Sequence, residues 1–434
     1  MKKSFKTSII ILLIGGLLTK VLGMIIKIVM SRLIGTEGLG LYMMVLPTFS
    51  LFIGISQFGL PTALSKLIAE DTKNNIKLLF SIIPISIIVN TILMLIIFFI
   101  APYLSKYLLH DERCYLPIIA IAFVIPFTSI SSICRSYFFG KEKMTPHVIS
   151  NLVEDIVRLT VMIIGIPLII NKGLSYTVCF IILSNILSET TSIITLIFFL
   201  PKNITLKKKD LKPNKNYIKE SLSIGIPNTT GRLIGSIGYF LEPIILTTTL
   251  LMAGYSNNYI TNEYGILSGY VMPLLLLPSF FTLAISQALL PIVSKEYAKK
   301  NLKEVKRKIQ QAITYSLIIG IPITIIFMLM PAVFLRLIYN TNKGILYMRA
   351  LAPICLIQYI QAPLTFSLDA MGKSKDSMKA TTIGVILRTT LLIILSLLKI
   401  GIFSLIISIS INVIVVTIYS IFKVKKSLTI TNYK

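Results

Sequence analysis

The chain has 434 residues, of which 55% are hydrophobic and 14% are charged, and its mean hydropathy is +0.84. Soluble domains carry about 25% charged residues, so this composition excludes an ordinary water-soluble globule and predicts an all-α, polytopic membrane protein. The net charge of +26 suits anionic lipid or nucleic acid. No nucleic-acid motif accompanies the charge, and most lysines lie between apolar runs, so we expect membrane lipids rather than nucleic acid as partners.

Twelve apolar segments are long enough to be membrane helices, for which about 18 or more apolar residues are typical. In chain order they are 7–34, 41–69, 77–100, 115–139, 145–170, 174–200, 220–251, 262–290, 309–330, 346–370, 378–398 and 401–422. Lysine and arginine concentrate in every second connection, and cytoplasmic loops are the ones enriched in these residues. The pattern therefore predicts a multi-pass protein of the cytoplasmic membrane with both termini in the cytoplasm.

Two short motifs recur at almost the same separation and indicate an internal repeat. SKxxA begins at Ser65 and again at Ser294, and a GK pair begins at Gly140 and again at Gly372. Parallel repeats are one way to build a transporter whose site lies between the two halves. We therefore expect an N-terminal six-helix lobe at 1–200, a basic cytoplasmic linker at 201–219 and a C-terminal six-helix lobe at 220–434, around a central cavity.

The first helix carries two lysines, Lys20 and Lys27, within an otherwise apolar run. Seven residues turn a helix by about 700°, so the two side chains lie about 20° apart around the axis and about 10 Å apart along it. Like charges on one stripe disfavour burial in lipid, and an aqueous cavity or a bound anion relieves that cost. The alternative is that each lysine extends its amine to an opposite membrane surface.

The seventh helix carries Arg232 near its middle, in the stretch GIPNTTGRLIGSIGYFLEP. Glycines around it keep one side of the helix thin and leave room for a ligand or a close neighbouring helix. Glu242 lies ten residues further on, on a nearby face, where it could pair with Arg232. We predict Lys20, Lys27 and Arg232 as binding residues for an anionic substrate.

Other intramembrane charges have structural interpretations beside functional ones. Glu154 and Arg158 are four residues apart and could form an internal ion pair, whereas Glu189 and Arg388 have no obvious partner in the sequence and could pair with each other or with the backbone. Arg135, near a helix end, is interpreted as reaching toward the membrane surface. The cysteines and histidines show no metal-site or catalytic spacing, so we expect no resident cofactor and no enzyme.

Five stretches resemble the multidrug/oligosaccharidyl-lipid/polysaccharide exporter superfamily, and within it the polysaccharide-biosynthesis branch around stage V sporulation protein B, which is related to lipid II flippases. They are TKVLGMIIKIVMSRLIGTEGLGLY (19–42), FGLPTALSKLIAE (58–70), IGIPNTTGRLIGSIGYFLEP (224–243), ALLPIVSKEYAKKN (288–301) and APLTFSLDAMGKSKDSM (362–378). The resemblance implies two lobes that alternate between inward-open and outward-open states.

In the flippase relatives, first-helix basic residues line a cationic cavity that receives a pyrophosphate. By motif position, Lys20 matches such a first-helix cation and Arg232 matches the seventh-helix arginine. Lys27 stands where the branch usually has arginine, which keeps the charge but lowers bidentate phosphate recognition. The chain also ends after about twelve helices, whereas many relatives carry two more.

Together with the lysines of the first helix, the resemblance implies a flippase or exporter of an undecaprenyl-pyrophosphate-linked saccharide, such as a peptidoglycan, spore-cortex or polysaccharide precursor. We expect a monomer whose transport is coupled to Na⁺, H⁺ or the membrane potential. One alternative is a cation-coupled multidrug exporter of the same superfamily, for which Glu189, Glu242 and Asp369 could supply the carboxylates. Another is a membrane scaffold that recruits division or sporulation partners without transporting anything.

Overall fold

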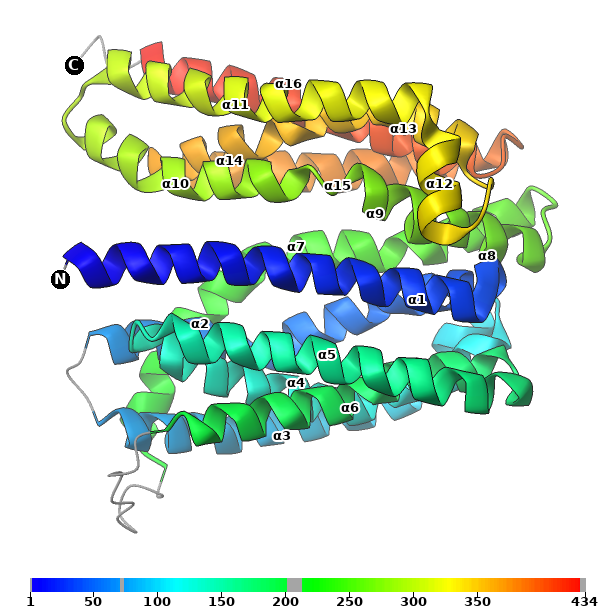
Figure 1. The fold of residues 1–434 in the computed structure, drawn as a ribbon, viewed down its shortest axis with the longest axis horizontal. Helices are drawn as coiled ribbons and strands as arrows, with labels where there is room; N and C mark the ends of the chain where they lie inside the picture. Colours follow the sequence, from blue (N-terminus) through cyan, green and yellow to red (C-terminus); the bar gives the residue numbers. More distant parts are fainter. Residues whose placement is uncertain (1, 71–73, 201–212, 430–434) are drawn as a thin grey trace. The chain divides into compact units, whose positions relative to one another are not determined.

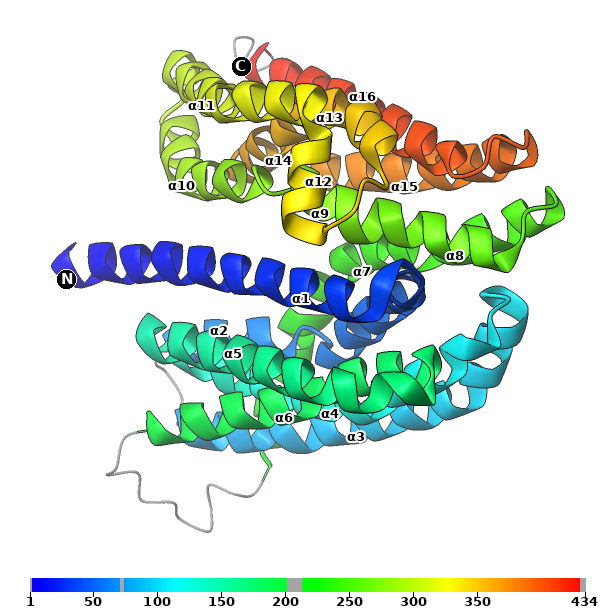
Figure 2. The same ribbon diagram turned by 45° about the vertical axis from the view of Figure 1, so that its right-hand side comes forward.

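The computed structural model describes residues 2–70, 74–200 and 213–429, and within these ranges the chain is helical with no β-strand. Two compact units, Met1–Pro243 and Ile244–Lys434, divide the chain, and the division falls inside one long helix, α7 (Lys215–Met252). Most of the basic linker expected at 201–219 lies outside the described residues. Figures 1 and 2 show the helices of each unit running side by side as a bundle.

The first unit contains six helices before α7. They are α1 (Lys2–Gln57), α2 (Leu60–Ala69), α3 (Asn75–Tyr103), α4 (Tyr115–Gly140), α5 (Met144–Ile169) and α6 (Leu174–Phe198), with short helical turns η1 (Leu104–Leu108), η2 (Glu112–Cys114) and η3 (Ile170–Lys172) at the connections. Helix α4 packs on α3 and α6, α6 packs on α5, and α5 packs on α1. This order places α4, α5 and α6 around a shared interior.

The second unit contains the rest of α7 and the helices that follow it. They are α8 (Asn257–Gly265), η4 (Ile266–Val271), α9 (Met272–Leu275), α10 (Ser279–Ala298), α11 (Leu302–Leu329), α12 (Pro331–Tyr339), α13 (Ile345–Tyr359), α14 (Gln361–Ala370), α15 (Ser374–Leu397) and α16 (Phe403–Thr429). Helix α10 packs on α11 and α14, and α15 packs on α16. Prolines lie at or next to several helix junctions here, including Pro278 and Pro331, where the missing N–H is tolerated.

Among the described residues, nine helices are long and apolar enough to cross a membrane, or ten if α8–α9 and α10, which are bent by 51°, form one span. Helix α1 is apolar over 44 residues, about 66 Å, which is roughly twice the hydrocarbon thickness. Gly35, with φ 68° and ψ −172°, breaks it into two. Helix α5 is not among these helices, because every stretch of 18 residues within it contains the three charges of Glu154, Asp155 and Arg158. Within the described residues, ten spans become twelve when α5 is added and the two parts of α1 are counted separately, as the sequence predicts.

Close helix contacts in the first unit occur at glycines. A side chain at Gly15 of α1 would collide with Val148 of α5, and one at Gly165 of α5 would collide with the ring of Phe180 of α6. A Cβ at Gly225 of α7 would lie 2.8 Å from the carbonyl oxygen of Phe58, so α7 begins against the α1–α2 junction. These contacts fix α1, α5, α6 and the start of α7 in one unit.

Large apolar side chains point outward from the helices of both units. Phe99 and Phe198 are each 83% exposed, and Leu337 is 73% exposed. A hydrocarbon-facing surface accounts for such exposure, because these side chains would otherwise face water at a cost. The chain is a multi-pass membrane protein.

Candidate functional site

The α1 stripe, defined as Lys20 and Lys27, lies on an uninterrupted stretch of helix ahead of the break at Gly35. Lys20 is exposed and Lys27 is half-buried. Because the helix is regular between them, the two side chains share the face expected from their spacing. In the described part of the chain, neither amine has an ion-pair or hydrogen-bond partner. Two cations in an apolar segment therefore lack a compensating partner in the described part of the chain.

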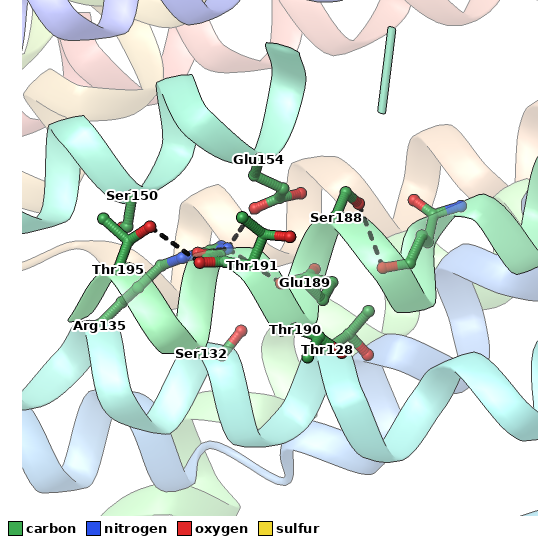
Figure 3. Close-up of polar contacts among 12 residues, drawn as sticks. Thr128, Ser132, Arg135, Ser150, Glu154, Ser188, Glu189, Thr190, Thr191 and Thr195 are labelled. Carbon is green, nitrogen blue, oxygen red and sulfur yellow. Dashed lines mark hydrogen bonds and ion pairs between the residues drawn. The ribbon is translucent and has the colours of Figure 1, made fainter. Parts of the chain in front are cut away.

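The charge cluster, defined as Arg135, Glu154, Asp155, Arg158 and Glu189, lies among α4, α5 and α6. Figure 3 shows Arg135 of α4 extending toward Glu154 of α5 and Glu189 of α6. The Arg135 guanidinium donates through Nη2 to a Glu154 carboxylate oxygen, and to Glu189 Oε2 at 2.9 Å. The side chains of Glu154 and Glu189 are 9% and 8% exposed, so this bridge ties three helices together away from solvent.

A second arginine completes the charge cluster from within α5. Arg158 Nη2 donates to the other carboxylate oxygen of Glu154, so Glu154 lies between two guanidinium groups. Arg158 Nη1 lies 3.7 Å from Asp155 Oδ1, which is beyond hydrogen-bond distance. The remaining Asp155 oxygen, Oδ2, is buried and has no hydrogen-bond partner in the described structure.

Hydroxyl groups surround the charge cluster on the α6 side. Ser192 accepts a hydrogen bond of 2.9 Å from Arg135 Nη2, whereas the hydroxyls of Thr190 and Thr191, labelled in Figure 3, donate to backbone carbonyls within α6. Buried ions need such hydrogen bonds as well as a partner to offset their desolvation. The cluster holds two guanidinium groups and three carboxylates, so its formal charge is −1.

Two interpretations made from the sequence change here, and one is confirmed. The Glu154–Arg158 pair at spacing i, i+4 is present. Arg135, interpreted as reaching toward the membrane surface, instead has a side chain only 16% exposed and bridges Glu154 and Glu189. Glu189, which has no obvious partner in the sequence, pairs with Arg135. The interpretation failed because a residue near one end of a helix can still face the bundle interior, and spacing within one helix does not show its partners on two others.

Three other predicted site residues, Arg232, Glu242 and Arg388, lie in α7 and α15. Arg232 belongs to α7, but its side chain is outside the described part, so its proposed pairing with Glu242 stays a prediction. Glu242 is buried in the same helix. Arg388 lies half-buried in α15 of the second unit. No group of three or more metal-binding side chains suited to a metal ion occurs among the described residues.

Two protein-family models match this chain, and so do individual proteins of Bacillus subtilis (strain 168). The polysaccharide biosynthesis protein family matches residues 5–297, and the MatE family matches residues 267–394. Stage V sporulation protein B of Bacillus subtilis (strain 168) is 33% identical over 406 residues, covering 91% of this chain and 78% of that protein. Lipid II flippase MurJ of the same organism is 22% identical over 410 residues, covering 88% and 75%.

Solved structures show the same fold. The inward closed conformation of lipid II flippase MurJ superposes with a TM-score of 0.72 at 16% identity, covering 96% of this chain and 88% of that one. At this identity the match establishes the arrangement of helices and leaves the ligand open.

Proposed function

Because the chain belongs to the polysaccharide biosynthesis protein family, whose relatives are membrane transporters rather than enzymes, we propose that it flips an undecaprenyl-pyrophosphate-linked saccharide across the cytoplasmic membrane. The relative named lipid II flippase supports a lipid-linked substrate. The resemblance of the first and seventh helices to the flippase motifs supports a pyrophosphate as the group that is bound.

The α1 stripe carries this proposal. Lys20 and Lys27 are cations in an apolar segment with no partner among the described side chains, whereas Arg135 and Arg158 are bonded to carboxylates. An unpaired charge within the membrane is costly unless water or a counter-ion compensates it. A pyrophosphate supplies both the compensating charge and strong acceptors for the two amines. Arg232 is the proposed third contact.

The test is translocation of a fluorescent undecaprenyl-pyrophosphate disaccharide in vesicles that contain the purified full chain. Losing one charged hydrogen bond costs about 1.5–3 kcal/mol, so Lys20→Ala and Lys27→Ala should each lower the rate at limiting substrate by about tenfold to hundredfold. Lys27→Arg should keep most of the rate. Lys303→Ala, at an exposed position of α11, is the matched control. Wild-type rates in both alanine variants would exclude the α1 stripe as the binding site.

A cation-coupled multidrug exporter is the second candidate, and the match of the MatE family to residues 267–394 favours it. Such a protein needs membrane carboxylates that bind and release a cation. In the described part of the first unit, the three carboxylates of the charge cluster lie within 4 Å of arginine nitrogens. The two candidates separate when drug efflux and lipid translocation are measured on the same vesicles, since only the multidrug exporter should move a cationic dye.

A further inference from the structure

A pocket of about 660 Å³ lies at one end of the second unit. Its walls come from α8, from the first residue of η4, from the turn between α12 and α13, from the start of α13 and from the first residue of α16. Figures 1 and 2 show the α7–α8 and α15–α16 turns at this end and the α10–α11 turn at the opposite end. The volume falls in the range usual for small-molecule sites, about 300–1,000 Å³.

Three aromatic rings line the pocket, and each of them contacts another ring. Tyr347 and Phe403 meet edge to face, with ring centroids 5.6 Å apart. Tyr259 stacks on Tyr255, with centroids 4.9 Å apart and an interplanar angle of 21°. Rings fixed in this way offer flat apolar surfaces with little conformational entropy left to lose. Such surfaces suit the C–H face of a sugar ring.

Polar groups lie between the rings and are themselves positioned. The Tyr347 hydroxyl donates to Glu263 Oε2 at 2.5 Å, and Asn262 Nδ2 donates to the Asn258 carbonyl at 2.9 Å. Arg336 Nε donates to Asn342 Oδ1 at 2.6 Å, which leaves the amide nitrogen of Asn342 to donate elsewhere. Carboxylates accept and amides both donate and accept. Sugar hydroxyls, which do both, match this set.

The charge of the pocket distinguishes its ligand from that of the α1 stripe. One carboxylate, Glu263, and one amine, Lys343, are among the described lining residues and balance each other, and the exposed Arg336 lies beside them, where it donates to Asn342. A pyrophosphate needs several cations or a row of backbone N–H donors, and among the described residues the lining supplies one cation, which is balanced by one carboxylate. A neutral, hydroxyl-rich molecule has no such requirement.

We propose that this pocket of the second unit binds a small neutral saccharide. The assignment rests on the proposed function only for the source of the sugar, which would be the head group of the lipid-linked substrate. The lysines at the opposite end of the unit, including Lys299, Lys300 and Lys373, mark that end as cytoplasmic by the usual loop bias. The pocket then faces the outer side, where it holds the sugar after translocation and before release.

The test is isothermal titration of the purified full chain with N,N′-diacetylchitobiose, with maltose and with inorganic pyrophosphate. We expect saturable binding of at least one disaccharide, and no competition by pyrophosphate. Glu263→Gln and Asn262→Ala should each weaken that binding by about tenfold or more, as loss of a positioned polar contact does. Tyr315→Ala, an exposed tyrosine of α11, is the control for removing a ring, to be compared with Tyr259→Ala.

The results of this titration test the pocket assignment separately from the proposed function. No heat with either disaccharide, equal affinity in the pocket variants and the wild type, or displacement of the sugar by pyrophosphate would overturn the assignment. Lys27→Ala should bind the disaccharide as the wild type does, because the α1 stripe is a different site. If the wild type fails to translocate lipid-linked saccharide but still binds the free sugar at this pocket, the proposed function fails and the pocket assignment stands.

Discussion

The first unit places cations in two contrasting settings within its membrane-spanning helices. In the charge cluster, Arg135 and Arg158 are bonded to carboxylates of α5 and α6. On α1, which packs against α5, Lys20 and Lys27 have no such partner in the described structure. A guanidinium group bonded to buried carboxylates on neighbouring helices is suited to holding those helices together, even though the Nε of Arg135 and of Arg158 has no hydrogen bond in the described structure. Under the proposed function, lysines left without partners keep their donors for a ligand that binds and leaves.

The contrast extends to residue type. Arginine presents a planar fork that matches carboxylates, and lysine presents a point charge on a flexible stem. The cluster uses arginine where three helices must be fixed. The α1 stripe uses lysine where, under the proposed function, a pyrophosphate must bind and leave. The comparison therefore predicts that stability and transport depend on different cations of the same unit.

The largest expected effect is on stability, from Arg135→Met. The substitution leaves Glu154 and Glu189 buried with one guanidinium fewer, and breaking a buried ion pair by removing one partner costs about 3–5 kcal/mol. We expect a large fall in the melting temperature of the purified chain and loss of the monodisperse peak in size-exclusion chromatography. Arg349→Met, at an exposed position of α13, is the control. An unchanged melting temperature for Arg135→Met would contradict a structural role for the cluster.

A smaller loss of stability is expected from Glu154→Gln. This carboxylate accepts from both arginines, and a hydrogen bond to a charged group contributes about 1.5–3 kcal/mol. Both guanidinium groups keep one carboxylate each, Glu189 for Arg135 and Asp155 for Arg158, so the loss should be about 2–3 kcal/mol and below that of Arg135→Met. Denaturant titration of the two variants side by side gives the order, and the reverse order would show that Glu154 contributes more to the stability of the cluster than Arg135 does.

The α1 stripe should behave in the opposite way, which Lys27→Leu tests. Removing a half-buried amine from an apolar helix relieves part of the cost of a membrane charge, and the free energy of unfolding should rise by about 1 kcal/mol. Translocation should fall at the same time, since the proposed phosphate contact is lost. A variant that loses both stability and transport would show that Lys27 supports the fold. Thermal unfolding and vesicle transport on one preparation separate the two outcomes.

How much of the fold and of the candidate site could be predicted from the sequence depends on how far apart in the chain the interacting residues are. Apolar length and loop charge suffice for the twelve helices, because both depend on residues near one another in the chain. The Glu154–Arg158 pair was predictable for the same reason, since four residues bring both to one face. Arg135 was misplaced because its partners lie 19 and 54 residues away on helices whose rotation is set by packing, as at Gly165 against Phe180.

The smallest effect is expected from Asp155→Asn, and it probes the extra carboxylate of the charge cluster. Asp155 lies next to Glu154 in sequence, but its Oδ1 is 3.7 Å from Arg158 and its Oδ2 has no hydrogen bond among the described residues. An amide of the same shape removes the excess negative charge and leaves both bridges of Glu154 in place. The free energy of unfolding should therefore stay within about 1 kcal/mol of the wild type and change toward greater stability. Denaturant titration beside Glu154→Gln makes the comparison, because the two variants remove neighbouring carboxylates from the same helix. A loss as large as that of Glu154→Gln would mean that the charge of Asp155 near Arg158 contributes as much to the stability of the cluster as the bonds of Glu154 do.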